Sequence, residues 1–280
     1  MNKAQLLDRF GAGGFIRPVP DEGEFKARWL TIPSSSDAFT AALHGGLIAD
    51  RLSWVFLAAY QSAVRACFKD MPDQCWLSFA VSEDKRGNFP GTRLEDGKLH
   101  GSKSWIAGVN HVDHLLVTIG PSLDHGCLIV DCAGPEVELG ARPDASFLAD
   151  MSQGHATFHD YPINDESWVD AAGAIDFGLA EPFFVSTAAC GYLLKEGQRL
   201  RLDDVVQSAQ NLLDKMETLF QAGFASDLES FLPLYQSVKE LGQTCSAGSA
   251  ASNDQAATDW QQNGRLLGMY GKGLRARAEQ

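Results

Sequence analysis

The sequence predicts an α+β protein in which short N-terminal helices and a C-terminal helical bundle flank a central β-barrel or β-sandwich domain. Near the N-terminus and again after residue 173, apolar residues recur at three- and four-residue intervals, the spacing of buried helix faces. Between these stretches, short apolar runs bounded by glycines and turn residues are typical of strands. We therefore expect a shortened N-terminal helical segment at 1–75, a β-domain at 76–172 and a helical domain at 173–280.

The first 33 residues are expected to be mainly loop with one short helical turn, because glycines and prolines interrupt any long helix. The serines at 34–36 and Asp37 then offer helix caps. Two helical stretches follow, and we expect them to break near Gly45 and Gly46 and to end at about Phe68.

The central runs are WLSFAVSE, KLHGSKSWIAG, HLLVTIG, GCLIVD, VELG and HATFHDYPI. Asp96-Gly97 and the segment 124–126 are hairpin or loop signals between such runs. Regular short strands with frequent glycines indicate a sandwich or a small barrel.

The strongest helix signal lies between Asp203 and Gly223, which are a candidate N-cap and a candidate stop. Its apolar stripe from Val205 to Phe220 is long enough to exceed one intramolecular contact, so we expect a homodimer or a larger homo-oligomer. The polar segment 244–257 is expected to be a loop or an exposed helix start, before a final helix that carries Trp260.

A formal net charge of −13 argues against nucleic acid as a partner, and an anionic coenzyme would need a local cluster of donors. We find no apolar run of the ~18 residues that a membrane span needs, and the start lacks the order of a secretion signal, so we expect a cytoplasmic protein. The six cysteines are scattered, which predicts reduced, mostly buried thiols and no metal site.

Generic catalytic templates are absent: the sequence has no GxGxxG after a strand, phosphate loop, HExxH or GxSxG. The segment from Phe79 to Gly120 contains Ser82-Glu83 followed by a turn at Gly87-Asn88, then GSKSWI and then VDHLLV. In order and spacing it resembles the middle domain of the acyl-CoA dehydrogenase family. GHATFHDYPI at 154–163 resembles the closing strand of that domain, and STAACG at 186–191 resembles the first C-terminal helix. The flanking helical segments look shorter than in an ordinary member.

This resemblance implies that FAD lies between the barrel and the C-terminal helices. Ser82 matches the hydroxyl that bonds the flavin pyrimidine edge, and Trp105 matches the indole packed on the ring system. Gly87 and Asn88 match a turn near the phosphates, and Ala107 stands where a Thr or Ser contacts the flavin. The plainer alternatives are that Trp105 is core, that Ser82 closes a turn and that Gly87 supplies a positive φ.

Two departures concern the C-terminal half. The family's Gln-x-x-Gly-Gly segment and its late catalytic Glu are not matched here. In some members the base lies instead at the start of the first long C-terminal helix, and Glu181 matches that position. The alternative is that Glu181 and Pro182 simply begin a helix, where a carboxylate and a proline both fit.

The resemblance thus implies an FAD-dependent oxidoreductase that acts on an acyl thioester, with acyl-CoA as the expected small-molecule substrate, or on a related compound. One alternative is a non-catalytic descendant that keeps the scaffold to bind a partner. Another is a flavin monooxygenase on the same fold, which needs no carboxylate base.

Overall fold

The computed structural model describes residues 1–280 apart from 12, 14–16, 88, 251–254 and 280. The chain divides into two compact units. A helical unit consists of Met1–Ala63, Ser146–Leu148 and Asp176–Gln280, and a β unit consists of Val64–Ala145 and Ala149–Ile175. The two terminal helical segments therefore share one unit, while the expected boundaries at 75/76 and 172/173 stay predictions.

The N-terminal segment is more helical than the sequence suggested. Its α-helices are α1 (Lys3–Gly11), α2 (Glu22–Trp29), α3 (Ala38–Ile48) and α4 (Leu52–Cys67). The expectation of a mainly looped start was wrong because the helix breakers lie at the ends of helices: α1 ends at Gly11, and Asp21 caps α2 by accepting a hydrogen bond from the Glu24 N–H (2.8 Å).

The expected break at Gly45 and Gly46 was also wrong, since α3 continues through both glycines. A Cβ at Gly46 would overlap the carbonyl of Ala188, and one at Gly45 would overlap the Ala58 methyl group. These glycines therefore allow close packing between helices and do not end one. Asp37 caps α3, as predicted, by accepting from the Thr40 N–H at 2.7 Å.

The C-terminal α-helices are α5 (Phe177–Leu200), α6 (Asp203–Ala222), α7 (Leu228–Ala250), α8 (Gln255–Asn263) and α9 (Gly271–Ala278). Short 3₁₀ helices are η1 (Asp165–Ser167), η2 (Ala172–Asp176), η3 (Phe224–Ser226) and η4 (Gly264–Gly268). Helix α6 ends at Gly223 as predicted, but Leu202 and not Asp203 is its N-cap residue.

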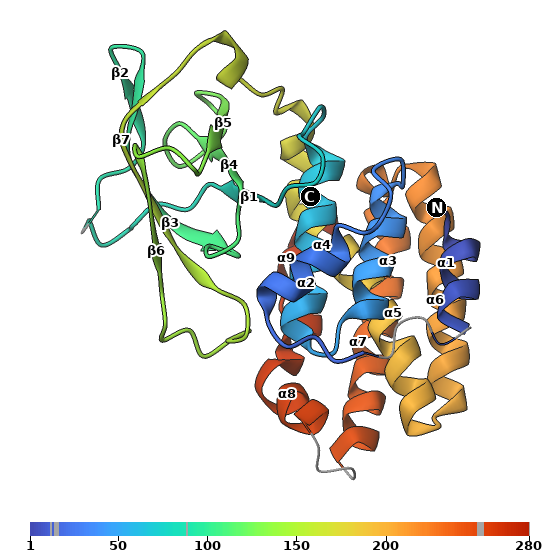
Figure 1. Cartoon of the computed structure of the whole chain (residues 1–280). Helices are drawn as coiled ribbons and strands as arrows, with labels where there is room; N and C mark the ends of the chain where they lie inside the picture. The colour runs from blue at the N-terminus through green and yellow to red at the C-terminus, as the bar shows by residue number, and fades with distance from the viewer. Residues whose placement is uncertain (12, 14–16, 88, 251–254, 280) are drawn as a thin grey trace. The chain divides into compact units, whose positions relative to one another are not determined.

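Helix α5 packs against α3, α6 and α7 (Figure 1). The segment Ala172–Leu200 is long and apolar enough to cross a membrane, contrary to our count of apolar runs, but 78% of its most apolar window is buried inside the protein. The apolar stripe of α6 is also covered within the chain, from Val205 to Leu219. The stripe on which we based the predicted homo-oligomer is therefore not free to contact a second chain, and the oligomer stays a prediction.

The β unit contains two sheets (Figure 1). One has the order β1 (Leu77–Ala80), β4 (His114–Thr118), β5 (Cys127–Asp131), and the other has the order β2 (Arg93–Glu95), β3 (Lys98–Ala107), β7 (Gln153–Pro162), β6 (Val137–Ala141). Strands β1 and β4 are parallel, and the other paired strands are antiparallel.

One apolar core joins the two sheets, with contributions from Leu99 and Phe158 in one and Leu115 and Val130 in the other. A sandwich-like arrangement is therefore observed, whereas a closed barrel is not confirmed, because the ladders of the described strands leave β1 and β5 at the edges of one sheet and β2 and β6 at the edges of the other. The predicted two-residue turn at Asp96-Gly97 joins β2 to β3, and both residues have positive φ.

Candidate functional site

The β unit contains a pocket of about 500 Å³, here called the β-unit pocket. Its walls come from the segment after β1, from β3 and from the ends of β6 and β7. The lining residues are Ser82, Glu83, Asp84, Lys85, Arg86, Phe89, Ser104, Trp105, Arg142 and His155. Two of the residues expected to bind a cofactor, Ser82 and Trp105, thus line the same pocket.

Trp105 lies on β3 beside the fully buried Ile106, and the two side chains have different environments. Ile106 belongs to the apolar core, whereas the Trp105 indole is half-buried and lines the pocket. Its Nε1 donates a hydrogen bond to Gln153 Oε1 (3.3 Å). Ile106, and not Trp105, therefore belongs to the apolar core.

Ser82 follows β1 and is exposed. Its backbone carbonyl accepts a hydrogen bond from the Ser104 N–H at 2.7 Å, which holds this segment alongside β3. Because the described residues include no hydrogen-bond partner for the Ser82 hydroxyl, this group is available to a ligand.

Two other predicted cofactor residues, Gly87 and Ala107, are not among the described residues that line the pocket. Gly87 has φ +75° in an exposed turn, where a side chain would meet nothing, so its backbone conformation explains the glycine. Ala107 is buried, and its N–H donates to Ser78 Oγ (3.3 Å), so this donor is already used. Asn88 lies outside the described residues.

Positive charge gathers at the β-unit pocket although the chain is strongly acidic. Lys85, Arg86 and Arg142 line it, and none of them has an acidic partner among the described side chains. Arg142 donates to the Ser104 carbonyl at 2.9 Å, which fixes one end of its guanidinium beside Trp105. Adjacent basic residues at 85–86 were a visible signal that we did not use, whereas Arg142 carries no local motif.

The acidic residues at the pocket are largely compensated. Glu83 pairs with Lys103 at 3.0 Å and accepts hydrogen bonds from the Thr92 N–H and hydroxyl. Burial raises the pKa of Glu83, but the hydrogen bonds from Lys103 and Thr92 outweigh burial and leave the pKa below its usual value. Asp84 accepts from the Arg86 N–H at 2.9 Å. The pocket is therefore an electropositive site in an acidic protein.

One wall of the pocket is a stacked pair. The rings of Phe89 and His155 lie 5.3 Å apart at 27°. His155 lies directly over Gly140 on the neighbouring strand, where any Cβ would collide with the imidazole. Together with Trp105, this pair gives the pocket flat apolar faces that suit an aromatic ligand.

The helical unit holds the predicted base, Glu181. Helix α5 begins at Phe177, so Glu181 lies in the second turn and Pro182 lies inside the helix. The alternative that these residues begin the helix was therefore wrong. Burial raises the pKa of Glu181 to about 7, although an interaction with the Tyr270 side chain lowers it. The Tyr270 hydroxyl is buried, and it makes no hydrogen bond of standard geometry to a described residue.

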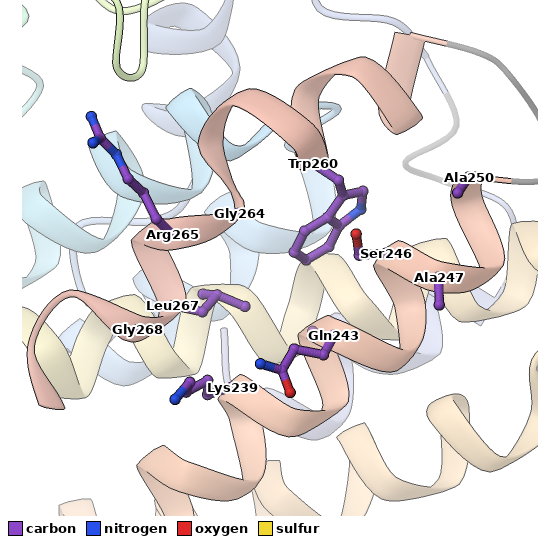
Figure 2. A pocket seen from close by; sticks show the side chains of 11 residues that line it. Lys239, Gln243, Ser246, Ala247, Ala250, Trp260, Gly264, Arg265, Leu267 and Gly268 are labelled. Atoms are coloured by element: carbon purple, nitrogen blue, oxygen red, sulfur yellow. The ribbon is translucent and has the colours of Figure 1, made fainter.

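A second pocket of about 500 Å³ lies between α7 and the segment formed by α8 and η4 (Figure 2). Small residues and the Trp260 indole line much of it, and Lys239 lies at one end. The Arg265 side chain points away from the other labelled residues, and its guanidinium lies 4.1 Å from the centre of the Phe147 ring. This pocket therefore lacks the charge cluster of the β-unit pocket.

No family model matches the sequence, and no curated protein matches it. Solved structures do match. The structure of PigA with FAD and proline is 15% identical with a TM-score of 0.67, and the match covers 99% of this chain and 98% of that one. A FAD-dependent dehydrogenase is 14% identical with a TM-score of 0.63, covering 97% and 92%. Glutaryl-CoA dehydrogenase from Mycobacterium smegmatis is 14% identical with a TM-score of 0.56, covering 96% and 82%.

The chain has an acyl-CoA dehydrogenase-like fold. The similarity includes the helices on both sides of the β unit, which the sequence comparison left largely unmatched. At 14–15% identity the similarity defines the fold, and the function has to be argued from the site.

Proposed function

We propose that the protein is an FAD-dependent oxidoreductase that acts on an acyl thioester or a related carbonyl compound. The observation that carries this proposal is the position of Ser82 and Trp105 in one electropositive pocket. These residue types match the flavin contacts implied by the sequence resemblance. The fold supports the same cofactor, because PigA, which has this fold, was solved with FAD.

The β-unit pocket fits the chemistry of a flavin dinucleotide. Trp105 offers a broad indole face to the flat ring system, and the Ser82 hydroxyl is available to bond a carbonyl at its edge. Lys85, Arg86 and Arg142 supply the local donors that an anionic coenzyme needs in a protein of net charge −13. Bound there, the flavin would accept a hydride from the substrate.

Glu181 is the proposed general base. The α-proton of an acyl thioester is too weakly acidic for water to remove, so a carboxylate has to take it. A base works best when its pKa is near the operating pH, and the Glu181 pKa of about 7 meets this condition. Its place in the second turn of α5 leaves the carboxylate without a capping role at the helix start.

Two steps test the proposal. The purified chain is first incubated with FAD and passed through a desalting column, and we expect it to stay yellow. The yellow protein is then mixed with acyl-CoA substrates of different chain lengths in the absence of oxygen, and at least one should bleach the flavin. A chain that takes up no FAD would favour a scaffold, and a yellow chain that no acyl-CoA reduces would point to a monooxygenase.

The cytoplasmic location and the homo-oligomer also stay part of the proposal. Light scattering over a wide range of concentrations tests the second of these. A particle of 30.3 kDa at every concentration would contradict it.

A further inference from the structure

Lys103 on β3 is completely buried, and its ammonium group lies among four acceptors. Nζ is 2.7 Å from the Gly120 carbonyl, 2.9 Å from Thr118 Oγ1, 3.0 Å from Glu83 Oε1 and 3.2 Å from the Val81 carbonyl. An ammonium has three protons to donate, so every proton has an acceptor. We call Lys103 and these four acceptors the Lys103 cluster.

The Lys103 cluster fastens the segment that forms one wall of the β-unit pocket. Val81 and Glu83 flank Ser82 directly, and both accept from Lys103. Glu83 also accepts from the backbone and the hydroxyl of Thr92, at the far end of the same segment. A single buried cation thus holds Ser82 from both sides and, through Glu83, joins the two ends of the segment 81–92.

Such a contact is costly to form and stabilises only one arrangement. A buried ammonium needs acceptors on all its protons, and a slightly shifted loop would leave a charge without partners. Burial lowers the pKa of Lys103, and the contact with Glu83 offsets part of this effect. The exposed part of the segment carries Lys85 and Arg86, whose side chains make no comparable contact with described residues.

We propose that Lys103 is the positioning residue of the β-unit pocket: through Glu83 and the Val81 carbonyl it fixes the described residues 81–87, so that Ser82 and the Lys85-Arg86 pair face the ligand that Trp105 contacts. Lys103 itself touches no ligand, because none of its surface is exposed. The identity of the ligand as FAD rests on the proposed function.

The first test is proteolysis of the full chain, and it needs no cofactor. Trypsin cleaves after lysine and arginine, so Lys85 and Arg86 report directly on release of the segment. We expect Lys103→Met to raise the rate of cleavage at these two sites by about tenfold or more, since local opening exposes the backbone. Val130→Ala, which trims the core of the same unit on β5, is the matched control for general loss of stability.

The second test uses the flavin itself. In the wild type, the Trp105 indole should quench the fluorescence of bound FAD. With Lys103→Met we expect at least tenfold weaker FAD retention and less quenching per bound flavin, whereas Val130→Ala should keep the wild-type quenching even where its melting temperature falls. Should Lys103→Met fail to fold, Glu83→Gln removes the carboxylate charge that pairs with Lys103 at almost constant volume and carries the same two readouts.

Equal cleavage at Lys85 and Arg86 in Lys103→Met and Val130→Ala, or unchanged quenching in Lys103→Met, would overturn the positioning role. If wild-type protein binds no FAD, the proposed function fails while the proteolysis result still decides the role of Lys103. The two failures are therefore distinguishable.

Discussion

The β unit and the helical unit bury carboxylates in opposite ways. Glu83 lies beside Lys103 and Thr92, and the resulting hydrogen bonds leave its pKa below the usual value. Glu181 is half-buried, no described cation pairs with it, and burial raises its pKa to about 7. A paired carboxylate stays ionised and serves structure, whereas an unpaired one titrates near neutrality and is suited to proton transfer.

The same contrast separates the two kinds of site. In the β unit, hydrogen bonds from Lys103 to Glu83 and from Arg142 to the Ser104 carbonyl hold residues that line the β-unit pocket. In the helical unit, the proposed chemistry depends on one carboxylate, Glu181, whose pKa is raised by burial to about 7. The predictions below test each half of this comparison.

The largest expected effect is on catalysis. Glu181→Gln keeps the size of the side chain and removes its basicity, so it should fold normally, keep FAD and lose reduction by acyl-CoA by on the order of a hundredfold or more. Rapid-mixing absorbance under exclusion of oxygen measures this rate. In the wild type the rate should rise as pH passes through about 7. Reduction of the Gln variant at the wild-type rate would remove Glu181 from the mechanism.

The second prediction concerns the pH dependence of stability. The pKa of Glu181 rises from 4.5 in the unfolded chain to about 7 in the folded one, so the folded state binds the proton more tightly. The contribution of Glu181 to the free energy of unfolding is therefore fully present below pH 4.5, and it is lost as pH rises through about 7.

Glu181→Gln should consequently gain stability relative to wild type between these pH values, by up to roughly 3 kcal/mol above neutrality. Urea unfolding of both proteins at acidic and alkaline pH checks this. A difference that does not change with pH would contradict the burial of an unpaired carboxylate.

The third prediction concerns the contact between Trp105 and FAD in the β-unit pocket. Trp105→Ala should weaken FAD retention by about 1–3 kcal/mol, the scale of losing a large aromatic contact. Trp168→Ala is the matched control, because this indole lies in the same unit, is 46% exposed and is not among the residues that line the pocket. Equal FAD affinity in the two variants would show that Trp105 does not contact the flavin.

The smallest effect concerns charge. Arg142→Ala should weaken FAD binding by about 1 kcal/mol at low salt, and less at high salt, since an exposed cation is screened. Arg93→Ala is the control, because Arg93 is exposed on β2 and paired with Glu95 at 2.6 Å. Titrations at two ionic strengths test this, and an Arg142→Ala affinity equal to that of Arg93→Ala would exclude a role for this cation.

Motif spacing predicted the β unit better than the helical unit. Ser82 and Trp105 belong to a segment whose turns and strands are locally encoded, so their meeting in one pocket was accessible from the sequence. Arg142 follows β6 and belongs to no motif, and the partners of Lys103 depend on tertiary packing.

The wrong predictions for the helical unit concern residues that usually interrupt or begin a helix. Gly45 and Gly46 look like helix breakers in the sequence, but close packing of α3 against its neighbours overrides their low propensity. Pro182 looks like a helix start, yet α5 begins at Phe177, one turn earlier.

The most direct test of the proposed cofactor site is the FAD content of the purified wild-type chain. The protein is incubated with excess FAD, separated from free cofactor by gel filtration, and its visible flavin band is compared with its protein concentration. The β-unit pocket predicts close to one FAD retained per chain, with the flavin fluorescence quenched by Trp105. A colourless protein that folds normally would contradict the cofactor site and with it the proposed oxidoreductase.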